Sequence, residues 1–207
     1  DVDKFGNLDV ASTARKINKK TKMIVPVDFA GNPARIGEFM RLAKRYKLVV
    51  VEDACHALGA QLGKKKIGGL AHMTVFSFHP VKIITTGEGG MVLTNRDDLH
   101  RKLVRLHSHG TTRDPAQMEG ESHGPWYYQQ IDLGYNYRMT DIQAALGLSQ
   151  LGRIDEFVKR RHYLAGRYDR GFRDMPIDPV RQHADAWSAY HLYVIRLPLA
   201  KIGQTHR

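Results

Sequence analysis

Three polar side chains follow short apolar stretches of the sequence and carry groups capable of covalent or acid–base chemistry. Asp53 comes directly after "LVVVE", Ser77 follows the run that starts at Met73, and Lys82 lies in "SFHPVKIITTGEGG", on a predicted loop between two strands. Ligands of open α/β sheets bind outside the carboxyl ends of the strands. We therefore expect the acid, the hydroxyl and the amine to meet in one crevice.

A lysine and an aspartate in one crevice admit two interpretations. They can form a buried ion pair, and a lysine on a loop is more often only a solvated surface charge. They can also serve pyridoxal phosphate, whose aldehyde condenses with a lysine amine and whose protonated pyridine nitrogen needs a carboxylate partner. Spacing alone leaves both interpretations open, because an aspartate followed by a lysine is common by chance.

The elements that position these residues follow a strand–helix–strand order. Residues 22–29 and 48–53 are β-branched or apolar runs, and residues 33–47 between them have helical spacing with Pro33 near the start. Such a unit places two parallel strands in one sheet, and the unbroken apolar run before Asp53 is typical of a sheet covered on both faces. We expect an α/β fold with a central, largely parallel sheet flanked by helices.

The remaining sequence predicts further elements and a second unit. Strands are expected at 73–78, 90–94 and 188–197, and helices at 9–18, at 97–107 and in two segments from Arg138 onward, the first capped by Thr140. Proline content rises around "MPIDP". We therefore expect residues 1–150 to form the major domain, and residues 151–207 to form a connecting helix and the start of a smaller C-terminal domain.

The composition of the chain limits the classes of partner that it can bind. The 207 residues carry a formal net charge of +11, which favours anionic partners such as phosphorylated small molecules. The basic residues are not interleaved with a series of stacking aromatics, so we expect no nucleic acid. No apolar run is long enough to span a membrane, so no membrane partner is expected.

Cysteine and histidine usage limits the chemistry further. Cys55 is the single cysteine, so no internal disulfide can form, and the histidines lack metal-ligand spacing. We expect no metal site and a cytoplasmic location. Cys55 itself is expected to be a small packed residue.

Three segments carry a resemblance to a known family. "VVVEDACHALGA", "FSFHPVKIITTGEGGMVLTN" and "LGYNYRMTDIQAALGLSQL" resemble the hallmark segments of the DegT/DnrJ/EryC1/StrS sugar aminotransferases, which are fold-type I pyridoxal 5'-phosphate enzymes. The resemblance implies that Lys82 is the Schiff-base lysine and that Asp53 is the partner of the pyridine nitrogen. It also implies that His56 lies beside the cofactor ring and that Ser77 binds the cofactor phosphate.

The resemblance also implies a homodimer with composite active sites. In the family, the residue matching Asn136 reaches the phosphate in the neighbouring subunit's site. Without the family, Asn136 is better interpreted as a turn residue ahead of a helix, and the role of Arg138 stays open. Residues 109–131 are too long for an ordinary connection. Their aromatic residues, Trp126, Tyr127 and Tyr128, either cover a nucleotide or pack as a local cluster.

Within the family, this chain resembles members that act on a UDP-linked sugar of the pseudaminic acid type. The expected reaction moves an amino group from L-glutamate to C4 of a UDP-linked 4-keto-6-deoxy-N-acetylhexosamine. One alternative is another nucleotide 4-keto-6-deoxy sugar, of the GDP-linked perosamine type. Family dehydratases carry histidine at the lysine position, so Lys82 argues against them.

A second alternative is an inactive fragment that serves only as a binding module. The chain begins at Asp1 rather than at a methionine, and family members carry a substantial segment ahead of the region matched here. That segment supplies further groups for the cofactor phosphate and ring. We therefore expect this chain alone to bind the cofactor weakly or not at all.

Overall fold

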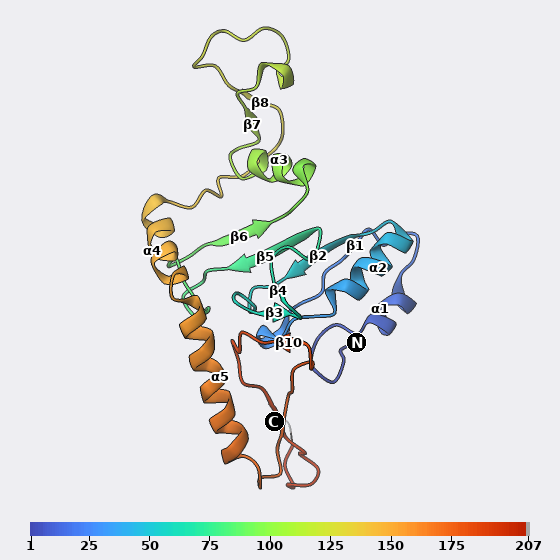
Figure 1. Ribbon diagram of the computed structural model, residues 1–207. Coiled ribbons are helices and arrows are strands. Elements are labelled where there is room, and N and C mark those ends of the chain that lie inside the picture. The colour runs from blue at the N-terminus through green and yellow to red at the C-terminus, as the bar shows by residue number, and fades with distance from the viewer. Residues whose placement is uncertain (206–207) are drawn as a thin grey trace.

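The computed structural model describes residues 1–205, and a four-stranded sheet with the order β1-β2-β5-β6 lies at its centre (Figure 1). The strands span Met23–Ile24 (β1), Val49–Asp53 (β2), Met73–Ser77 (β5) and Gly90–Leu93 (β6). β1, β2 and β5 pair in parallel, whereas β6 pairs antiparallel with β5. The predicted α/β fold with a largely parallel sheet is confirmed.

One face of this sheet is covered by helices. α2 (Ile36–Tyr46) presents Ile36, Phe39 and Ala43 at helical spacing, and these side chains pack against Val50 of β2 and Ile24 of β1. α1 (Val10–Lys16), whose first turn is capped by the Asp9 carboxylate, adds Val10 and its neighbours to the same cluster. The strand–helix–strand unit predicted from periodicity is therefore present.

The opposite face of the sheet is more open. Along β2 the burial alternates, with Val50 and Glu52 buried and Val51 and Asp53 half-buried. On β1 Met23 is 49% exposed. The expected coverage of both faces is therefore not found among residues 1–205.

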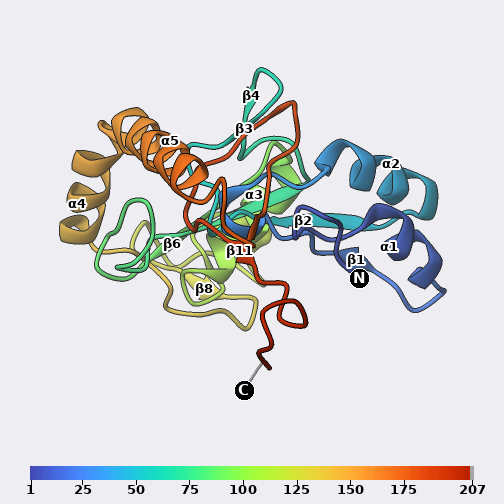
Figure 2. The same cartoon turned by 90° about the horizontal axis from the view of Figure 1, so that it is seen from below.

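A second core lies beneath the carboxyl ends of β2 and β5. Ala54, Ala57 and Ala60 are fully buried there, and α5 (Ile154–Gly171) packs Ile154 and Val158 against them. In Figure 2 α4 and α5 lie at one side of the sheet and α1 and α2 at the other. Two small hairpin-like sheets complete this region, formed by β3 (Gln61–Leu62), β4 (Lys65–Lys66) and β10 (Ala186–Trp187), and by β9 (Asp178–Pro179) and β11 (Ile195–Arg196).

A projecting arm follows α3 (Asp97–Leu106) and extends away from the sheet (Figure 1). It contains the paired strands β7 (Thr111–Thr112) and β8 (Gln129–Gln130), with the short helix η2 (Pro115–Gln117) between them. The long segment expected to lack periodicity therefore holds only a two-residue hairpin ladder and one 3₁₀ turn.

α4 (Asp141–Leu151) starts at a capping box. The Thr140 hydroxyl accepts the Gln143 amide, and the Gln143 side chain accepts the Thr140 amide. The same helix holds the loop that contains Lys82, because Gln150 Oε1 accepts the Thr85 amide at 3.1 Å. The predicted cap at Thr140 is confirmed.

The strand predicted at 188–197 was wrong over most of its length. Only Ile195–Arg196 pairs, with β9, and Tyr190 has a left-handed φ of 46° that a strand does not allow. The Ala189 amide donates to Gly31 O and the Leu192 amide donates to Ala30 O. These hydrogen bonds draw the segment onto the turn η1 (Phe29–Gly31), which also ends the strand predicted at 22–29 early.

Replacing Thr140 with alanine removes the hydroxyl that accepts the Gln143 amide, so we expect a loss of about 1 kcal/mol in unfolding free energy. Urea unfolding measures the effect. Ser149→Ala, an exposed change within the same helix, is the matched control and is expected to cost nothing. Equal stability of the two variants would contradict the capping assignment.

Candidate functional site

Asp53 is fixed at the carboxyl end of β2 by backbone hydrogen bonds to the segment that follows β1. Its amide donates to Pro26 O, and its carbonyl accepts the Asp28 amide, each at 2.9 Å. Its carboxylate accepts the Cys55 amide at 3.1 Å, which turns the chain sharply after the strand. The side chain is half-buried and lies on the open face of the sheet.

His56 stands on the loop that follows β2 and stacks on His191. Their ring centroids are 4.4 Å apart and the planes are tilted by 30°. Nδ1 of each ring is buried and has no hydrogen-bond partner within residues 1–205. The pair therefore offers a flat surface with unused polar atoms.

Lys82 lies on the loop between the strands β5 and β6, and its neighbours in the loop fix the position of its backbone. Its amide donates to His79 O at 2.9 Å, and Ile83 and Ile84 next to it are buried in the second core. The Lys82 side chain is half-buried, and its amine makes no hydrogen bond or salt bridge with the described residues. The loop thus fixes the backbone and leaves the amine free.

The charges of Lys82 and Asp53 act on the same two neighbours, which places both residues at one site. Burial lowers the pKa of His56; the Lys82 charge lowers it further, and the Asp53 carboxylate opposes this. Burial raises the pKa of the Cys55 thiol to about 12, and Asp53 reinforces the shift while Lys82 opposes it. Cys55 is therefore a neutral packed thiol.

His191 belongs to this site although it lies far along the chain from His56. Burial lowers the pKa of His191 to about 4, and the charges of His56, Lys82 and Arg161 add to the effect. Arg161 of α5 donates to the carbonyl oxygens of Tyr190 and His191, at 3.0 and 3.3 Å. Both stacked imidazoles are therefore neutral at pH 7.

Gly31 allows the three segments of the site to approach one another. Its φ is +93°, and a Cβ at this position would lie 2.8 Å from His56 O and 3.0 Å from the amide nitrogens of Tyr190 and His191. No side chain fits between these backbone atoms. The turn that follows β1 therefore lies against the backbone of both residues that form the imidazole stack.

Ser77 ends β5 on the same face of the sheet as Asp53, because Asp53 pairs with Val75 and side chains alternate along the strand. Its hydroxyl accepts the His79 amide at 3.3 Å, and its backbone pairs with Gly90. The side chain is half-buried. The predicted convergence thus covers Asp53, His56 and Lys82 by their electrostatic coupling and Ser77 by strand register.

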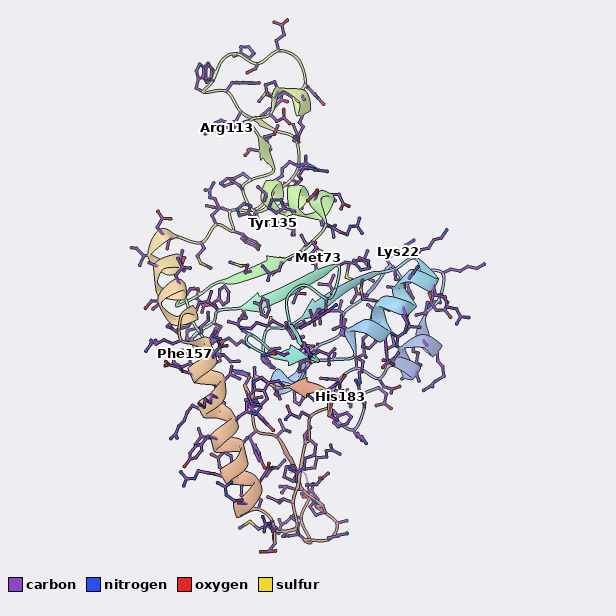
Figure 3. All side chains as sticks on the ribbon, viewed as in Figure 1. Lys22, Met73, Arg113, Tyr135, Phe157 and His183 are labelled. Atoms are coloured by element: carbon purple, nitrogen blue, oxygen red, sulfur yellow. The ribbon has the colours of Figure 1, made fainter. Side chains whose placement is uncertain are left out.

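Asn136 is not brought to the other predicted site residues. It is exposed and bridges to Ser108 at the base of the arm. Figure 3 shows Tyr135, the residue before it, on the arm side of the sheet. The Arg138 guanidinium donates to the Ser108 hydroxyl at 2.9 Å, so it holds the two strands of the arm base together.

The aromatic residues at the tip of the arm form a small cluster of their own. Trp126 meets Tyr127 edge-on with ring centroids 5.9 Å apart, and Tyr127 contacts His123 at 4.8 Å. Trp126 remains 71% exposed. The local packing expected as one alternative is present, and the exposed rings leave the covering role as a prediction.

His191 and Gly31 are the site residues that sequence reasoning missed. No motif in the sequence links His191 to His56. A signal did exist for Gly31, because "FAGNP" after a strand is a turn sequence, but it does not say what the turn touches.

Two further searches bear on the class of site. Within residues 1–205 no group of three or more His, Cys, Asp or Glu side chains is arranged to hold a metal ion. In the same part of the chain, no helix combines the length and the apolar character needed to cross a bilayer.

Comparison with known proteins identifies related sequences over nearly the whole chain. The sequence profile described as the DegT/DnrJ/EryC1/StrS aminotransferase family matches residues 1–206. A UDP-4-amino-4,6-dideoxy-N-acetyl-beta-L-altrosamine transaminase of Helicobacter pylori is 40% identical over 191 residues, which are 92% of this chain and 48% of that protein. A GDP-perosamine synthase of Caulobacter vibrioides is 39% identical over 194 residues, 92% of this chain and 49% of that protein.

Solved structures are similar over the same range. Helicobacter pylori PseC, an aminotransferase involved in the biosynthesis of pseudoaminic acid, matches with a TM-score of 0.88 and 36% identity over 98% of this chain and 52% of that one. The PLP-form of a putative sugar aminotransferase, Spr1654 from Streptococcus pneumoniae, matches with a TM-score of 0.80 and 30% identity over 95% of this chain and 56% of that one. The chain thus spans about half the length of the proteins it matches.

Gly31→Ala is expected to separate the segments that meet at the site. The new methyl group meets the carbonyl of His56 and two amides, in addition to the strain of a left-handed alanine, so we expect a loss of roughly 3 kcal/mol in unfolding free energy. The control is Gly63→Ala, where φ is +59° and nothing lies within 4 Å of the new Cβ, with an expected cost of about 1 kcal/mol. Equal losses measured by urea unfolding would show that the contact at Gly31 is unimportant.

Proposed function

Because the chain belongs to the DegT/DnrJ/EryC1/StrS aminotransferase family, we propose that it is the part of a pyridoxal phosphate-dependent sugar aminotransferase that carries the reactive lysine. The observation that carries the proposal is the placement of Lys82. Its amine has no partner among the described residues, and its charge reaches Cys55, His56 and His191. Asp53 acts on two of the same side chains.

The residues present fit pyridoxal phosphate. An unpaired amine suits the aldehyde, and a carboxylate at a strand end suits the pyridine nitrogen. The buried Nδ1 of His56 lacks a partner within residues 1–205, and its ring has a flat surface. A solved relative is described in a PLP-form, which supports the same cofactor.

Each residue has a distinct task in this proposal. The bound cofactor supplies an electron sink for the bond changes at the substrate carbon. Lys82 Nζ would hold the cofactor covalently and, once the substrate amine has displaced it, would be free to accept and return the proton of the substrate carbon. Asp53 would keep a proton on the ring nitrogen, His56 would lie against the ring, and Ser77 would bind the phosphate by its hydroxyl. Neutral His56 adds no second positive charge beside Lys82.

The proposed substrates are L-glutamate and a UDP-linked 4-keto-6-deoxy-N-acetylhexosamine, with the amino group arriving at C4. The similarity to the Helicobacter pylori transaminase and to PseC supports this choice. The similarity to a GDP-perosamine synthase keeps the GDP-linked sugar as the alternative. The net charge of +11 suits the diphosphate of either one.

We also propose a homodimer with composite sites. Asn136 is exposed and pairs with Ser108, the second residue after α3, at the start of the projecting arm. Leu133 and Tyr137 near it are 90% and 74% exposed, which is unusual for such apolar side chains and favours burial against a second copy. In that copy Asn136 would bind the cofactor phosphate.

The proposed location is the cytoplasm. Nucleotide sugars are the proposed substrates, and the single half-buried thiol of Cys55 needs no oxidising compartment.

Lys82→Ala in the full-length protein is expected to abolish amination. The methyl group provides no amine, so amino-sugar formation from glutamate should fall by roughly a thousandfold or more, and the visible absorption of the lysine-bound cofactor should disappear. The measurement is a coupled assay with UDP- and GDP-linked 4-keto sugars. Lys64→Ala, at an exposed lysine, is the control. A variant that keeps its activity would favour the binding-module alternative.

Mixing two inactive variants tests the composite site. Lys82→Ala and Asn136→Ala act in different sites of a dimer, so a hybrid dimer has one intact site and one doubly damaged site. After refolding at equal amounts, we expect recovery of about a quarter of the wild-type activity. Activity of the mixture no higher than that of the separate variants would show that Lys82 and Asn136 of one chain serve the same site.

A further inference from the structure

Two carboxyl groups lie buried directly behind the candidate site. Asp28 and Glu52 are both 0% exposed. Glu52 is the neighbour of Asp53 on β2 and points to the opposite, covered face of the sheet. Asp28 stands on the turn between β1 and Gly31. Neither residue has a part in the proposed chemistry.

One oxygen of each carboxyl group has a partner, and the other has none. Asp28 Oδ1 accepts the Ala34 amide at 2.8 Å, and Glu52 Oε2 accepts the Thr74 hydroxyl at 2.7 Å. Asp28 Oδ2 and Glu52 Oε1 are buried without a partner in the described residues. A proton shared between these two oxygens would give each of them a hydrogen-bond partner.

Among residues 1–205, no positively charged group acts on the pair in a way that would allow both carboxyl groups to ionise. The groups that act on Asp28 are Glu52 and Asp53 of β2 and the amide of Ala34 ahead of α2. Those that act on Glu52 are Asp28 and the hydroxyl of Thr74 on β5. Neither carboxyl group takes part in a salt bridge within residues 1–205. Two buried negative charges in contact are strongly unfavourable.

The direction of the proton follows from the same contacts. Burial raises the pKa of Asp28 well above its usual range, and the Glu52 carboxyl raises it further. Burial raises the pKa of Glu52 to about 7, while the hydrogen bonds from Thr74 and Asp28 oppose the shift. Asp28 is therefore the acid and Glu52 the acceptor.

We propose that Asp28 keeps its proton at neutral pH and donates it to Glu52, and that this buried acid pair positions the site. The pair joins the turn before Gly31 to the strand that carries Asp53. The backbone hydrogen bond from the Asp28 amide to the Asp53 carbonyl runs alongside it. Gly31 in turn contacts His56 and His191. Asp28 and Glu52 are thus positioning residues. Their link to catalysis rests on the proposed function, but the pair itself does not.

Infrared spectroscopy of the cofactor-free, full-length protein tests the pair directly. At about pH 8, where ordinary carboxyl groups are ionised, the wild type should show the C=O stretch of a protonated carboxylic acid. Asp28→Asn should lose it, because the amide donates to Glu52 without a titratable proton. Glu52→Gln should shift its frequency, because the Asp28 proton would then be donated to an amide oxygen in place of a carboxylate. Asp174→Asn, at an exposed acid, is the control and should keep it.

The pH dependence of the unfolding free energy provides a second test. Side chains that only fill space would not change this dependence, whereas a buried protonated acid would. Acids with raised pKa values bind more protons in the folded than in the unfolded state, so stability is full below about pH 4 and falls as pH rises. Each such acid changes the unfolding equilibrium constant by up to about tenfold per pH unit. The loss should continue to about pH 7 for Glu52. The raised pKa of Asp28 adds a loss of the same sign.

Asp28→Asn should reduce this slope by up to about tenfold per pH unit while keeping the hydrogen bonds, whereas Asp28→Ala should lose stability at every pH. Cofactor affinity should change in the same way as stability. Asp28→Asn should retain the affinity, and Asp28→Ala should weaken it. Absence of the protonated band in the wild type, or its persistence at the same frequency in both amide variants, would overturn the proposal. A present band with no cofactor binding by any variant would instead count against the proposed function.

Discussion

Strand β2 is hydrogen-bonded between β1 and β5, and the register of that pairing decides which side chains reach the candidate site. Val50 and Glu52 point to the face covered by α2, whereas Val51 and Asp53 point to the open face. A shift by one residue would exchange these sets and bury Asp53 in place of Glu52. The apolar alternation of β5, which sets Thr74 opposite Glu52, enforces the same register. The position of the site acid is therefore a consequence of core packing on the other face.

The same register buries Glu52 in the core, and the residues that make this burial tolerable are connected to the candidate site. Glu52 can stay in the core only with a hydroxyl and a protonated acid as neighbours, which Thr74 and Asp28 provide. Asp28 must then sit on a turn close to β2, and that turn continues into Gly31. Since Gly31 touches the backbone of His56 and His191, the constraint passes from the strand to the imidazole stack. Packing, buried acids and site geometry form one connected unit.

Local signals in the sequence were sufficient for the elements and for the strand-end residues. Hydrophobic periodicity gave α2, β2 and β5, and the position of Asp53 after an apolar run predicted its place at a sheet edge. Contacts between distant segments left no such signal. The run at 188–197 has the composition of a strand, but hydrogen bonds to Ala30 and Gly31 force Tyr190 into a left-handed conformation. His191 reaches His56 only through that turn, so neither periodicity nor spacing could reveal it.

The charge state of the imidazole stack distinguishes two roles that histidines can have near a phosphorylated cofactor. A protonated imidazole would suit the phosphate, whereas a neutral one suits the face of an aromatic ring. Burial and the charge of Lys82 lower the pKa of both His56 and His191, so the stack carries no charge at pH 7. The geometry therefore favours contact with the ring. Under the proposed function, the phosphate would then be bound by uncharged donors such as the Ser77 hydroxyl, which bind an anion by hydrogen bonds alone.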